Sequence, residues 1–202
     1  VSVSTGTTSS PQWPTSVIAS VHGALPANRY SQAEITEALS QLPQFAPHAD
    51  LLKRFHQTCK VDHRHLVLPL EEYPGLTDFG KSNSVFIEQS VKLGCDAVTA
   101  ALEDAGLLPT DVDAIFSTTV TGIAVPTLDA RIAGVLGFRP DVRRIPLFGL
   151  GCVAGAAGTA RVHDYLRGNP DGVAVLVAAE MCSLNFGALG ADIAGLVGTA
   201  LF

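Results

Sequence analysis

The segment RIPLFGLGCVAGAAGTARVHDYLR, residues 144–167, decides the fold because it predicts a strand, a tight turn and a helix in direct succession. We expect the strand over Arg144–Phe148, the turn at Gly149–Gly151 and the helix over Cys152–Arg167. The first turns of this helix hold only small or apolar residues, and a helix that is apolar all round is buried on all sides. Glycine weakens a helix by up to about 1 kcal/mol relative to alanine, so close packing in a central layer is expected to compensate.

Strands and helices alternate along the rest of the chain, which indicates a layered α/β fold. Further strands are predicted at Thr15–His22, Ala114–Thr119 and Val173–Ala179, and the last is a continuous apolar run of the kind that is buried on both faces. Residues 61–80 are expected to form a loop. Helices are predicted over Ser31–Leu42, with a Ser31–Glu34 capping box, over Asp50–Cys59, over Asn83–Ala105 ending at Gly106, over Pro126–Leu136 ending at Gly137, and from Asp192 onward.

The composition points to a body that is covered by something else. Only 16% of the 202 residues are charged, against about 25% in a typical soluble domain. The chain therefore either buries much of its surface against a partner or forms part of a larger globule. Its net charge of −6 without a cluster of basic residues argues against nucleic-acid binding. No apolar run reaches the roughly 18 residues that span a bilayer, so no membrane partner is expected.

The N-terminal segment and the pattern of cysteines both predict a cytoplasmic protein. Residues 1–14 are rich in Ser and Thr and lack a basic start, so they are expected to be a disordered tail rather than a signal peptide, with the domain at 15–202. The four cysteines form no CxxC pair, which argues against a zinc site and a disulfide framework and fits a reducing compartment. No metal is expected.

Cys152 is the candidate nucleophile because it follows a strand and a glycine-flanked turn and opens a helix. A helix N-terminus carries about half a positive charge and unpaired N–H groups, which favour a thiolate. The same N–H groups can hold a thioester oxyanion, so the implied chemistry is acyl transfer onto sulfur. The alternative is that Cys152 is a small buried hydrophobe, the usual fate of a free cysteine.

No general base for this thiol is evident among the six histidines. His163 lies eleven residues after Cys152 on the same predicted helix, which places it roughly 16 Å away. His56, His63 and His65 sit in a polar stretch that forms either a solvated face or a basic rim for a phosphate-bearing substrate. The residues thus indicate a nucleophile without a partner base.

Four segments resemble the type III polyketide synthases, the chalcone synthase-like enzymes. GLGCVAGAAG at 149–158 resembles the nucleophile motif of that family, although the cysteine segment alone would also suit a ketoacyl synthase III. The other segments are STTVTGIAVPTLDARI at 117–132, AAEMCSLNF at 178–186 and LVGTALF at 196–202. The resemblance implies a thiolase-like layered αβαβα fold, of which this chain supplies mainly the first half. It also implies a homodimer that takes acyl-CoA and malonyl-CoA as substrates and needs no cofactor.

The resemblance assigns roles to individual residues. It implies that Cys152 is the nucleophile, that Phe202 is a gatekeeper between the CoA tunnel and the cavity, and that Arg54 contacts the CoA phosphates. A second arginine of the family falls on Gln57. Val125 is expected to reach into the partner subunit's cavity, and a cis Val125–Pro126 bond is expected. The family's catalytic His and Asn belong to its second half and match no residue of this chain.

Cavity-lining positions of the family match Val120, Thr121, Cys182 and Asn185. Plant enzymes have threonine where Val120 and Asn185 stand, so a chalcone-type product is not expected. Naphthalene-forming bacterial relatives have cysteine at Val120, which argues against that product as well. The segment VPTLDARI at 125–132 is more similar to bacterial enzymes that extend fatty acyl starters, so the resemblance implies an alkylpyrone or an alkylresorcinol.

Three functions remain open from the sequence. The first is a decarboxylative condensing enzyme of the type III family. The second is a non-catalytic or truncated half that acts as an assembly partner, which the missing base and the apolar C-terminal run favour. The third is a ketoacyl synthase III-like enzyme acting on acyl carrier protein, which would want a basic docking patch that this acidic chain lacks.

Overall fold

A computed structural model describes residues 15–76 and 78–202; the predicted tail at 1–14 lies outside this range. The strands are β1 (Asn28–Ser31), β2 (His63–Leu66), β3 (Ala114–Thr119), β4 (Arg143–Phe148) and β5 (Ala174–Ala178). The α-helices are α1 (Gln32–Ser40), α2 (Ala49–Thr58), α3 (Phe79–Ala105), α4 (Leu128–Leu136), α5 (Ala154–Gly168) and α6 (Ile193–Leu201). Short 3₁₀ helices lie at Ala46–His48, Leu70–Gly75, Pro109–Asp111, Gly151–Val153 and Cys182–Ala188.

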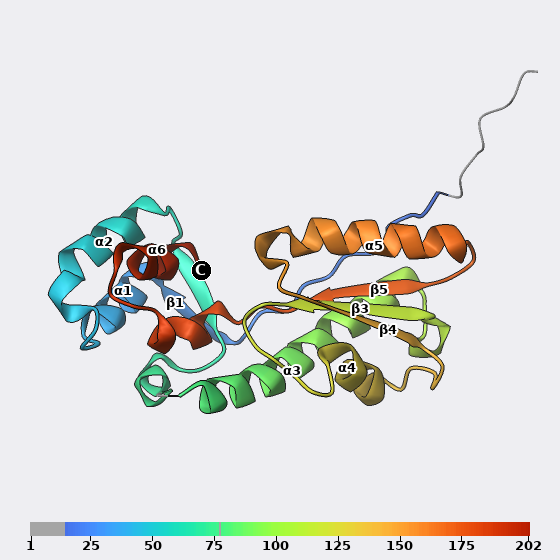
Figure 1. The fold of residues 1–202 in the computed structure, drawn as a ribbon, viewed down its shortest axis with the longest axis horizontal. Coiled ribbons are helices and arrows are strands. Elements are labelled where there is room, and N and C mark those ends of the chain that lie inside the picture. Colours follow the sequence, from blue (N-terminus) through green and yellow to red (C-terminus); the bar gives the residue numbers. More distant parts are fainter. Residues whose placement is uncertain (1–14, 77) are drawn as a thin grey trace, which may run out of the picture.

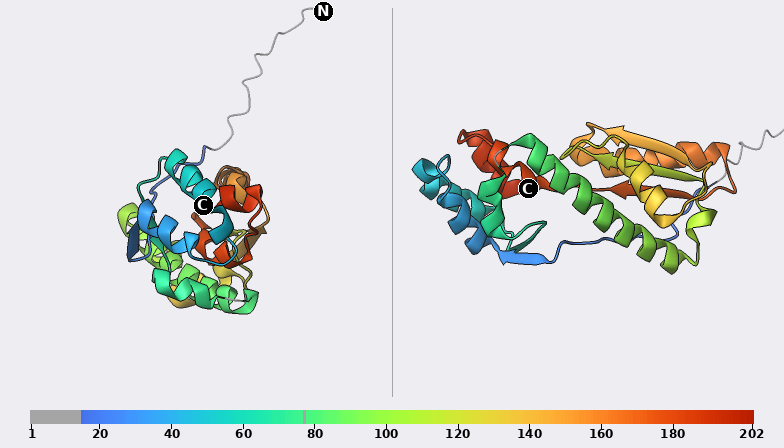
Figure 2. Two further views of the ribbon diagram at one scale, coloured as in Figure 1. Left: turned by 90° about the vertical axis from the view of Figure 1, so that its left-hand side faces the viewer. Right: turned by 90° about the horizontal axis from the view of Figure 1, so that it is seen from below.

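The elements gather into two lobes (Figure 1). The sheet lobe contains β3, β4 and β5 with α5 on one face and α3 and α4 on the other (Figure 1). The helical lobe contains α1, α2, α6 and the antiparallel pair β1–β2. Helix α3 runs from one lobe to the other, and the chain before β1 extends along the length of the molecule (Figure 2).

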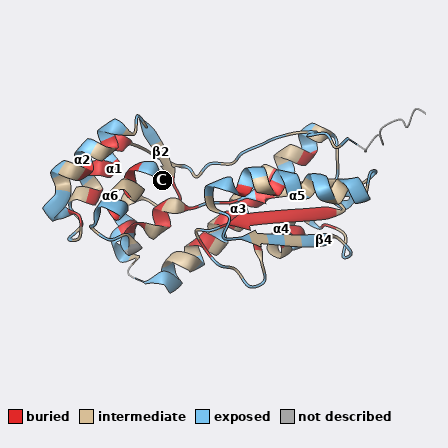
Figure 3. Cartoon of the chain, turned by 45° about the horizontal axis from the view of Figure 1, so that its top comes forward, coloured by how far each residue is buried: buried red, intermediate tan, exposed pale blue. Residues whose placement is uncertain are grey.

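The sheet confirms the layered α/β arrangement predicted from the sequence. Its strand order is β4-β3-β5 and both pairings are parallel. Every residue of the central strand β3 is buried (Figure 3). Parallel strands present their carboxyl ends at the same edge of a sheet. Thr118 of β3 pairs with Ala178 of β5 at this edge, and the segments that carry the candidate site follow from there.

Local end signals are confirmed at several helices. Ser31 caps α1, since Glu34 N–H donates to Ser31 Oγ and Ser31 N–H donates to the Glu34 carboxylate. Gly106 and Gly137 end α3 and α4 in the left-handed conformation. Asp192 Oδ1 accepts from Gly195 N–H at 2.9 Å and so caps α6. These signals need only neighbours a few residues away, which is why the sequence reveals them.

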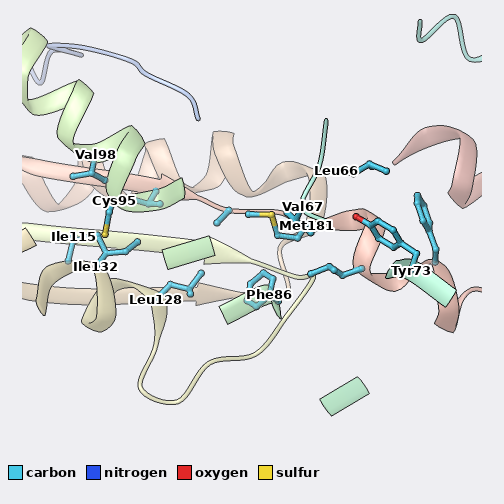
Figure 4. Packing of buried hydrophobic residues seen from close by; sticks show 14 of the residues in the cluster. Leu66, Val67, Tyr73, Phe86, Cys95, Val98, Ile115, Leu128, Ile132 and Met181 are labelled. Carbon is cyan, nitrogen blue, oxygen red and sulfur yellow. The ribbon is translucent and has the colours of Figure 1, made fainter. Parts of the chain in front are cut away.

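One hydrophobic core joins the two lobes. In the sheet lobe, Cys95 of α3 lies among Val98, Ile115 and Ile132 (Figure 4). Burial raises the pKa of the Cys95 thiol, which therefore serves packing rather than chemistry. The same cluster continues to Met181 and on into the helical lobe.

The predicted strand at Thr15–His22 is wrong, because this segment has no regular structure. It pairs with no strand of the described chain, and side-chain contacts hold it instead. Ser20 Oγ donates to the Ala101 carbonyl at 2.7 Å, and His22 Nε2 lies 3.4 Å from an Asp104 oxygen. Val17 and Val21 stay about 80% exposed, so burial of apolar side chains does not fix the segment as a strand.

The predicted loop at 61–80 is also wrong in part, since it contains β2, a 3₁₀ helix and the start of α3. Strand β2 exists because it pairs with β1, which the sequence analysis missed; Asn28 lies opposite Leu66. A pairing between segments almost forty residues apart leaves little local signal.

The burial predicted for β5 and for α5 is wrong, because each of these elements is covered mainly on one side. Strand β5 was expected to be buried on both faces, yet Ala178 is exposed and most of the strand is half-buried, because β5 is the edge of the sheet. Helix α5 was expected to be buried all round, yet only Ala154 and Gly158 are. Gly158 is the point of close approach, where an added Cβ would lie 2.8 Å from Leu176 Cδ1. Within the described residues, the sheet covers one side of α5, and Ser16 of the segment before β1 also contacts the helix at His163.

His56 lies in a buried polar cluster between α1, α2, α6 and β2. It is 3% exposed and faces Gln32, Thr36 and Thr199, and Arg64 is the charged group nearest the cluster. Burial, and secondarily the positive charge of Arg64, lowers the pKa of His56 to about 4. The imidazole is therefore neutral in the folded protein at neutral pH.

We expect folding stability to fall as the pH drops from about 6.5 towards 4. In this window the unfolded chain protonates His56 while the folded chain resists protonation, so stability is present above the unfolded pKa and is lost below it. The shift corresponds to roughly 3 kcal/mol at most. Urea unfolding at several pH values tests this, with His56→Gln as the comparison. An equally steep loss in His56→Gln would contradict the assignment.

Candidate active site at the end of the parallel sheet

Cys152 lies in the tight connection between β4 and α5. Gly149 and Gly151 have φ of 83° and 59°, a left-handed conformation that residues with a side chain adopt only at an energetic cost. These two glycines turn the chain sharply from the strand into a 3₁₀ turn at Gly151–Val153, and α5 begins directly after it. Cys152 is exposed in this 3₁₀ turn, two residues before α5 and not at the first position of the helix as the sequence predicted. The N-terminus of this fifteen-residue helix carries a partial positive charge.

Glu180 joins the carboxyl ends of β3 and β5 and was not singled out from the sequence. Its carboxylate accepts hydrogen bonds from Val120 N–H at 2.9 Å, from Thr121 N–H at 3.1 Å and from Thr121 Oγ1 at 2.6 Å. Thr121 Oγ1 in turn accepts from Met181 N–H at 2.9 Å. Glu180 thus fixes the turn that carries both predicted cavity residues, Val120 and Thr121. Its position two residues after β5, within the family-like segment AAEMCSLNF at 178–186, was the signal available from the sequence.

Cys182 and Asn185 lie in the 3₁₀ helix that follows Glu180, and both are half-buried. Burial raises the pKa of the Cys182 thiol, and the negative charges of Glu180 and Cys152 raise it further. The Cys182 thiol is therefore held neutral close to the candidate nucleophile. This is the reverse of what a second nucleophile would need.

An open hollow of about 980 Å³ lies along the free edge of β5. Its predominantly apolar wall includes Met181, Cys182 and Phe202, together with α3, α5 and the segment before β1. The structure therefore brings Cys182 and the predicted gatekeeper Phe202 to the same hollow. Phe202 is 49% exposed at the end of α6. Val120 and Thr121 are tied to this region through Glu180 rather than by lining the hollow itself.

The remaining two predicted residues lie on the outside of the molecule. Val125 is 86% exposed on the loop between β3 and α4, and the expected cis Val125–Pro126 bond is confirmed. Arg54 is exposed on α2, and no acceptor contacts its guanidinium within the described residues. Both side chains are free to meet a partner molecule.

The chain as described contains no base for Cys152. No hydrogen bond to its thiol is formed by any described residue. On α5, His163 Nδ1 lies 2.8 Å from Ser16 Oγ of the segment before β1. His56 is enclosed in its own polar cluster. Within residues 15–76 and 78–202, no three His, Cys, Asp or Glu side chains gather to hold a metal ion. None of the helices in that range is both long and apolar enough to cross a bilayer.

Comparison with known families gives a match over almost the whole chain. The model for chalcone and stilbene synthases, N-terminal domain, matches residues 5–202. A 1,3,6,8-tetrahydroxynaphthalene synthase from Streptomyces peucetius subsp. caesius is 48% identical over 187 residues, which cover 92% of this chain and 49% of the relative. The chain spans about half the length of the curated relatives that it matches.

Solved structures agree with the sequence match. The crystal structure of 1,3,6,8-tetrahydroxynaphthalene synthase from Streptomyces coelicolor A3(2), a bacterial type III polyketide synthase, superposes with a TM-score of 0.80 at 30% identity. That match covers 90% of this chain and 52% of the other. PKS-I from the brown alga Ectocarpus siliculosus gives a TM-score of 0.85 at 24% identity over 91% of this chain and 52% of the other, and this likeness concerns the fold. The expected thiolase-like fold is confirmed.

Proposed function

Because the chain belongs to the chalcone and stilbene synthase family, matching its N-terminal domain, we propose that it is the nucleophile-bearing half of a type III polyketide synthase. The observation that carries this proposal is Cys152, an exposed thiol on a sharp glycine turn just before α5. The proposal is supported by the resemblance around Cys152 and by its place just before a helix, whose partial positive charge and free N–H groups can stabilise developing negative charge.

The proposed reaction has two steps that use this thiol. The Cys152 thiolate attacks the carbonyl carbon of a starter acyl-CoA, a C–S bond to Cys152 forms, and CoA leaves as its thiolate. Malonyl-CoA then loses CO₂, and the resulting carbanion attacks the Cys152 thioester; a C–C bond forms and the Cys152 thiolate is released. Backbone N–H groups at the start of α5 are suited to hold the oxyanion in both steps.

We assign the flanking residues in the same proposal. Arg54 offers an uncompensated positive charge to the phosphates of CoA. Phe202 and Cys182 border the apolar hollow to which we assign the acyl chain. Cys152, Val120, Thr121 and Asn185 do not line that hollow, and we assign the last three to the wall between it and the nucleophile. Val125, on its exposed loop, reaches a second copy of the chain in a homodimer. No cofactor is proposed, since CoA thioesters provide the leaving group and the carbanion.

Two product classes differ in the starter. The apolar hollow beside Phe202 favours a fatty acyl starter and an alkylpyrone or alkylresorcinol product. The 48% identity to a tetrahydroxynaphthalene synthase favours a second candidate, in which malonyl-CoA is also the starter. The exposed Val120 separates this chain from the cysteine expected at that position in naphthalene-forming relatives.

Product analysis of the full-length protein tests the proposal. We expect polyketide from malonyl-CoA together with a fatty acyl-CoA, with the acyl carbons retained in the product. Formation of tetrahydroxynaphthalene from malonyl-CoA alone, with no incorporation of the acyl chain, would select the second candidate. Failure to consume either thioester would contradict the family activity and favour a non-catalytic assembly role.

A further inference from the structure

Phe202 follows α6 directly, so the position of this helix determines where the Phe202 ring stands. Phe202 directly follows α6, its N–H donates to the Gly198 carbonyl at 3.1 Å, and its half-exposed ring borders the hollow. Leu201 beside it is 62% exposed and gives little apolar hold. Ala200 in the same turn is buried, and two polar contacts hold this turn as well, one to Thr199 and one to the Ala200 carbonyl.

These contacts belong to a network that we name the α6 anchor, formed by Gln32, His56, Arg64 and Thr199. Arg64 fixes its polarity, since a guanidinium has only donors. Arg64 Nε–H donates to Gln32 Oε1 at 2.8 Å, so the Gln32 amide must turn its NH₂ towards His56. Two groups lie against His56 Nδ1: Gln32 Nε2 at 2.9 Å and Thr36 Oγ1 at 2.7 Å. Because the Gln32 NH₂ can only donate, Nδ1 accepts and carries no proton. The Thr36 hydroxyl, which also lies 2.5 Å from the Gln32 carbonyl oxygen, can donate to either acceptor.

The proton of neutral His56 is thereby assigned to Nε2, which faces α6. His56 Nε2 lies 3.1 Å from Thr199 Oγ1 and donates to it, and Thr199 Oγ1 donates to the Leu196 carbonyl at 2.7 Å. The second arm is shorter: Arg64 Nη2–H donates directly to the Ala200 carbonyl. Both arms start at Gln32 and Arg64 and end in the last turn of α6.

Burial makes the hydrogen bonds of this network difficult to replace. Gln32, His56 and Thr199 are 7%, 3% and 0% exposed, so water cannot replace a lost partner. A buried polar network in which each member is satisfied favours one arrangement of the packed elements over its neighbours. An apolar contact between α2 and α6 would tolerate a small rotation of α6, whereas the hydrogen bonds to Thr199 and Ala200 would not.

We propose that the α6 anchor is a positioning network that sets where the Phe202 ring stands at the hollow, and that it thereby tunes which acyl chain the site accepts. The role in acyl selection rests on the proposed function; the anchoring of α6 does not. None of the four residues is assigned to the chemistry at Cys152.

Thr199→Val tests the anchor with the least change of shape, because it removes the hydroxyl and keeps the branched volume. Thr199→Ser restores the hydroxyl and should restore the wild-type behaviour. Thr58→Val is the matched control, since Thr58 is exposed on α2 and its hydroxyl bonds only the Arg54 carbonyl. Arg64→Lys disrupts the two guanidinium hydrogen bonds, to Gln32 Oε1 and to the Ala200 carbonyl. It is the alternative variant if Thr199→Val does not fold.

The first readout is hydrogen exchange of the full-length protein, which needs no activity. Amides in the last turn of α6 should exchange about tenfold faster in Thr199→Val than in wild type, Thr199→Ser or Thr58→Val, as expected for the loss of one buried hydrogen bond. Amides of α5 should be unchanged. Unchanged exchange in α6 would overturn the anchor.

The second readout is the ratio of Cys152 acylation rates with hexanoyl-CoA and palmitoyl-CoA. We expect Thr199→Val to change this ratio by about threefold or more and Thr199→Ser to restore it, because a displaced aromatic wall alters the fit of buried methylenes. A wild-type ratio in a variant with faster α6 exchange would overturn the positioning role. Absence of acylation in wild type would instead refute the proposed function, while the exchange result still decides the anchor.

Discussion

Replacing Cys152 with alanine is expected to abolish acyl loading and to lower polyketide formation by the full-length protein by on the order of 10³-fold or more. The reason is that the remaining thiols are poorly placed to take over. Burial raises the pKa of the Cys95 and Cys182 thiols, and Cys59 Sγ donates to the His56 carbonyl. Product formation from labelled malonyl-CoA measures the loss.

Cys59→Ala is the matched control for that substitution, because it also removes one thiol and leaves the turn before α5 intact. It should load and condense as the wild type does. Retention of activity in Cys152→Ala would contradict the assignment, and so would equal losses in both variants, which would indicate a general effect of thiol removal. Circular dichroism establishes that each variant is folded before activity is compared.

Cys182→Phe is expected to discriminate against long starters. Cys182 borders the same hollow as Phe202 and Met181, so a phenyl ring there removes room for an acyl chain. Each methylene kept from the apolar hollow forfeits about 0.8 kcal/mol, so exclusion of three or four methylenes lowers kcat/KM for palmitoyl-CoA by roughly 10²-fold. Acetyl-CoA, which lacks those methylenes, serves as the internal control.

The measurement is the ratio of kcat/KM for palmitoyl-CoA and acetyl-CoA in wild type and Cys182→Phe. An equal loss with both starters would mean that the ring disturbs the site generally. An unchanged ratio would show that the acyl chain does not lie beside Cys182. Either result would remove Cys182 from the proposed cavity.

The parts of the fold that depend on near neighbours were predictable from the sequence. The capping box at Ser31, the glycine end of α3 at Gly106 and the strand-turn-helix around Cys152 each involve residues a few positions apart. β3 was also predictable, because its first half, residues 114–116, is an apolar run typical of a buried strand, although the second half is buried and polar.

The parts that depend on distant partners were not. The bond from Val120 N–H to Glu180 spans 60 residues, and the contact between His56 and Thr199 spans 143. Nothing in the local pattern around Glu180 or His56 distinguishes a residue that ties two elements together from one on a solvated face. The burial of α5 and β5 was overestimated because their apolar composition predicts covering layers on both sides, which the described residues do not supply.

The most direct test of the central claim is to find where the acyl group resides. The full-length protein is incubated with hexanoyl-CoA, its intact mass is measured, and the peptides are mapped by mass spectrometry. We expect one added hexanoyl group, located on the peptide that contains Cys152 and absent from Cys152→Ala. An unmodified Cys152 in folded protein, or an acyl group on Cys59, Cys95 or Cys182 instead, would contradict the assignment of Cys152 as the nucleophile.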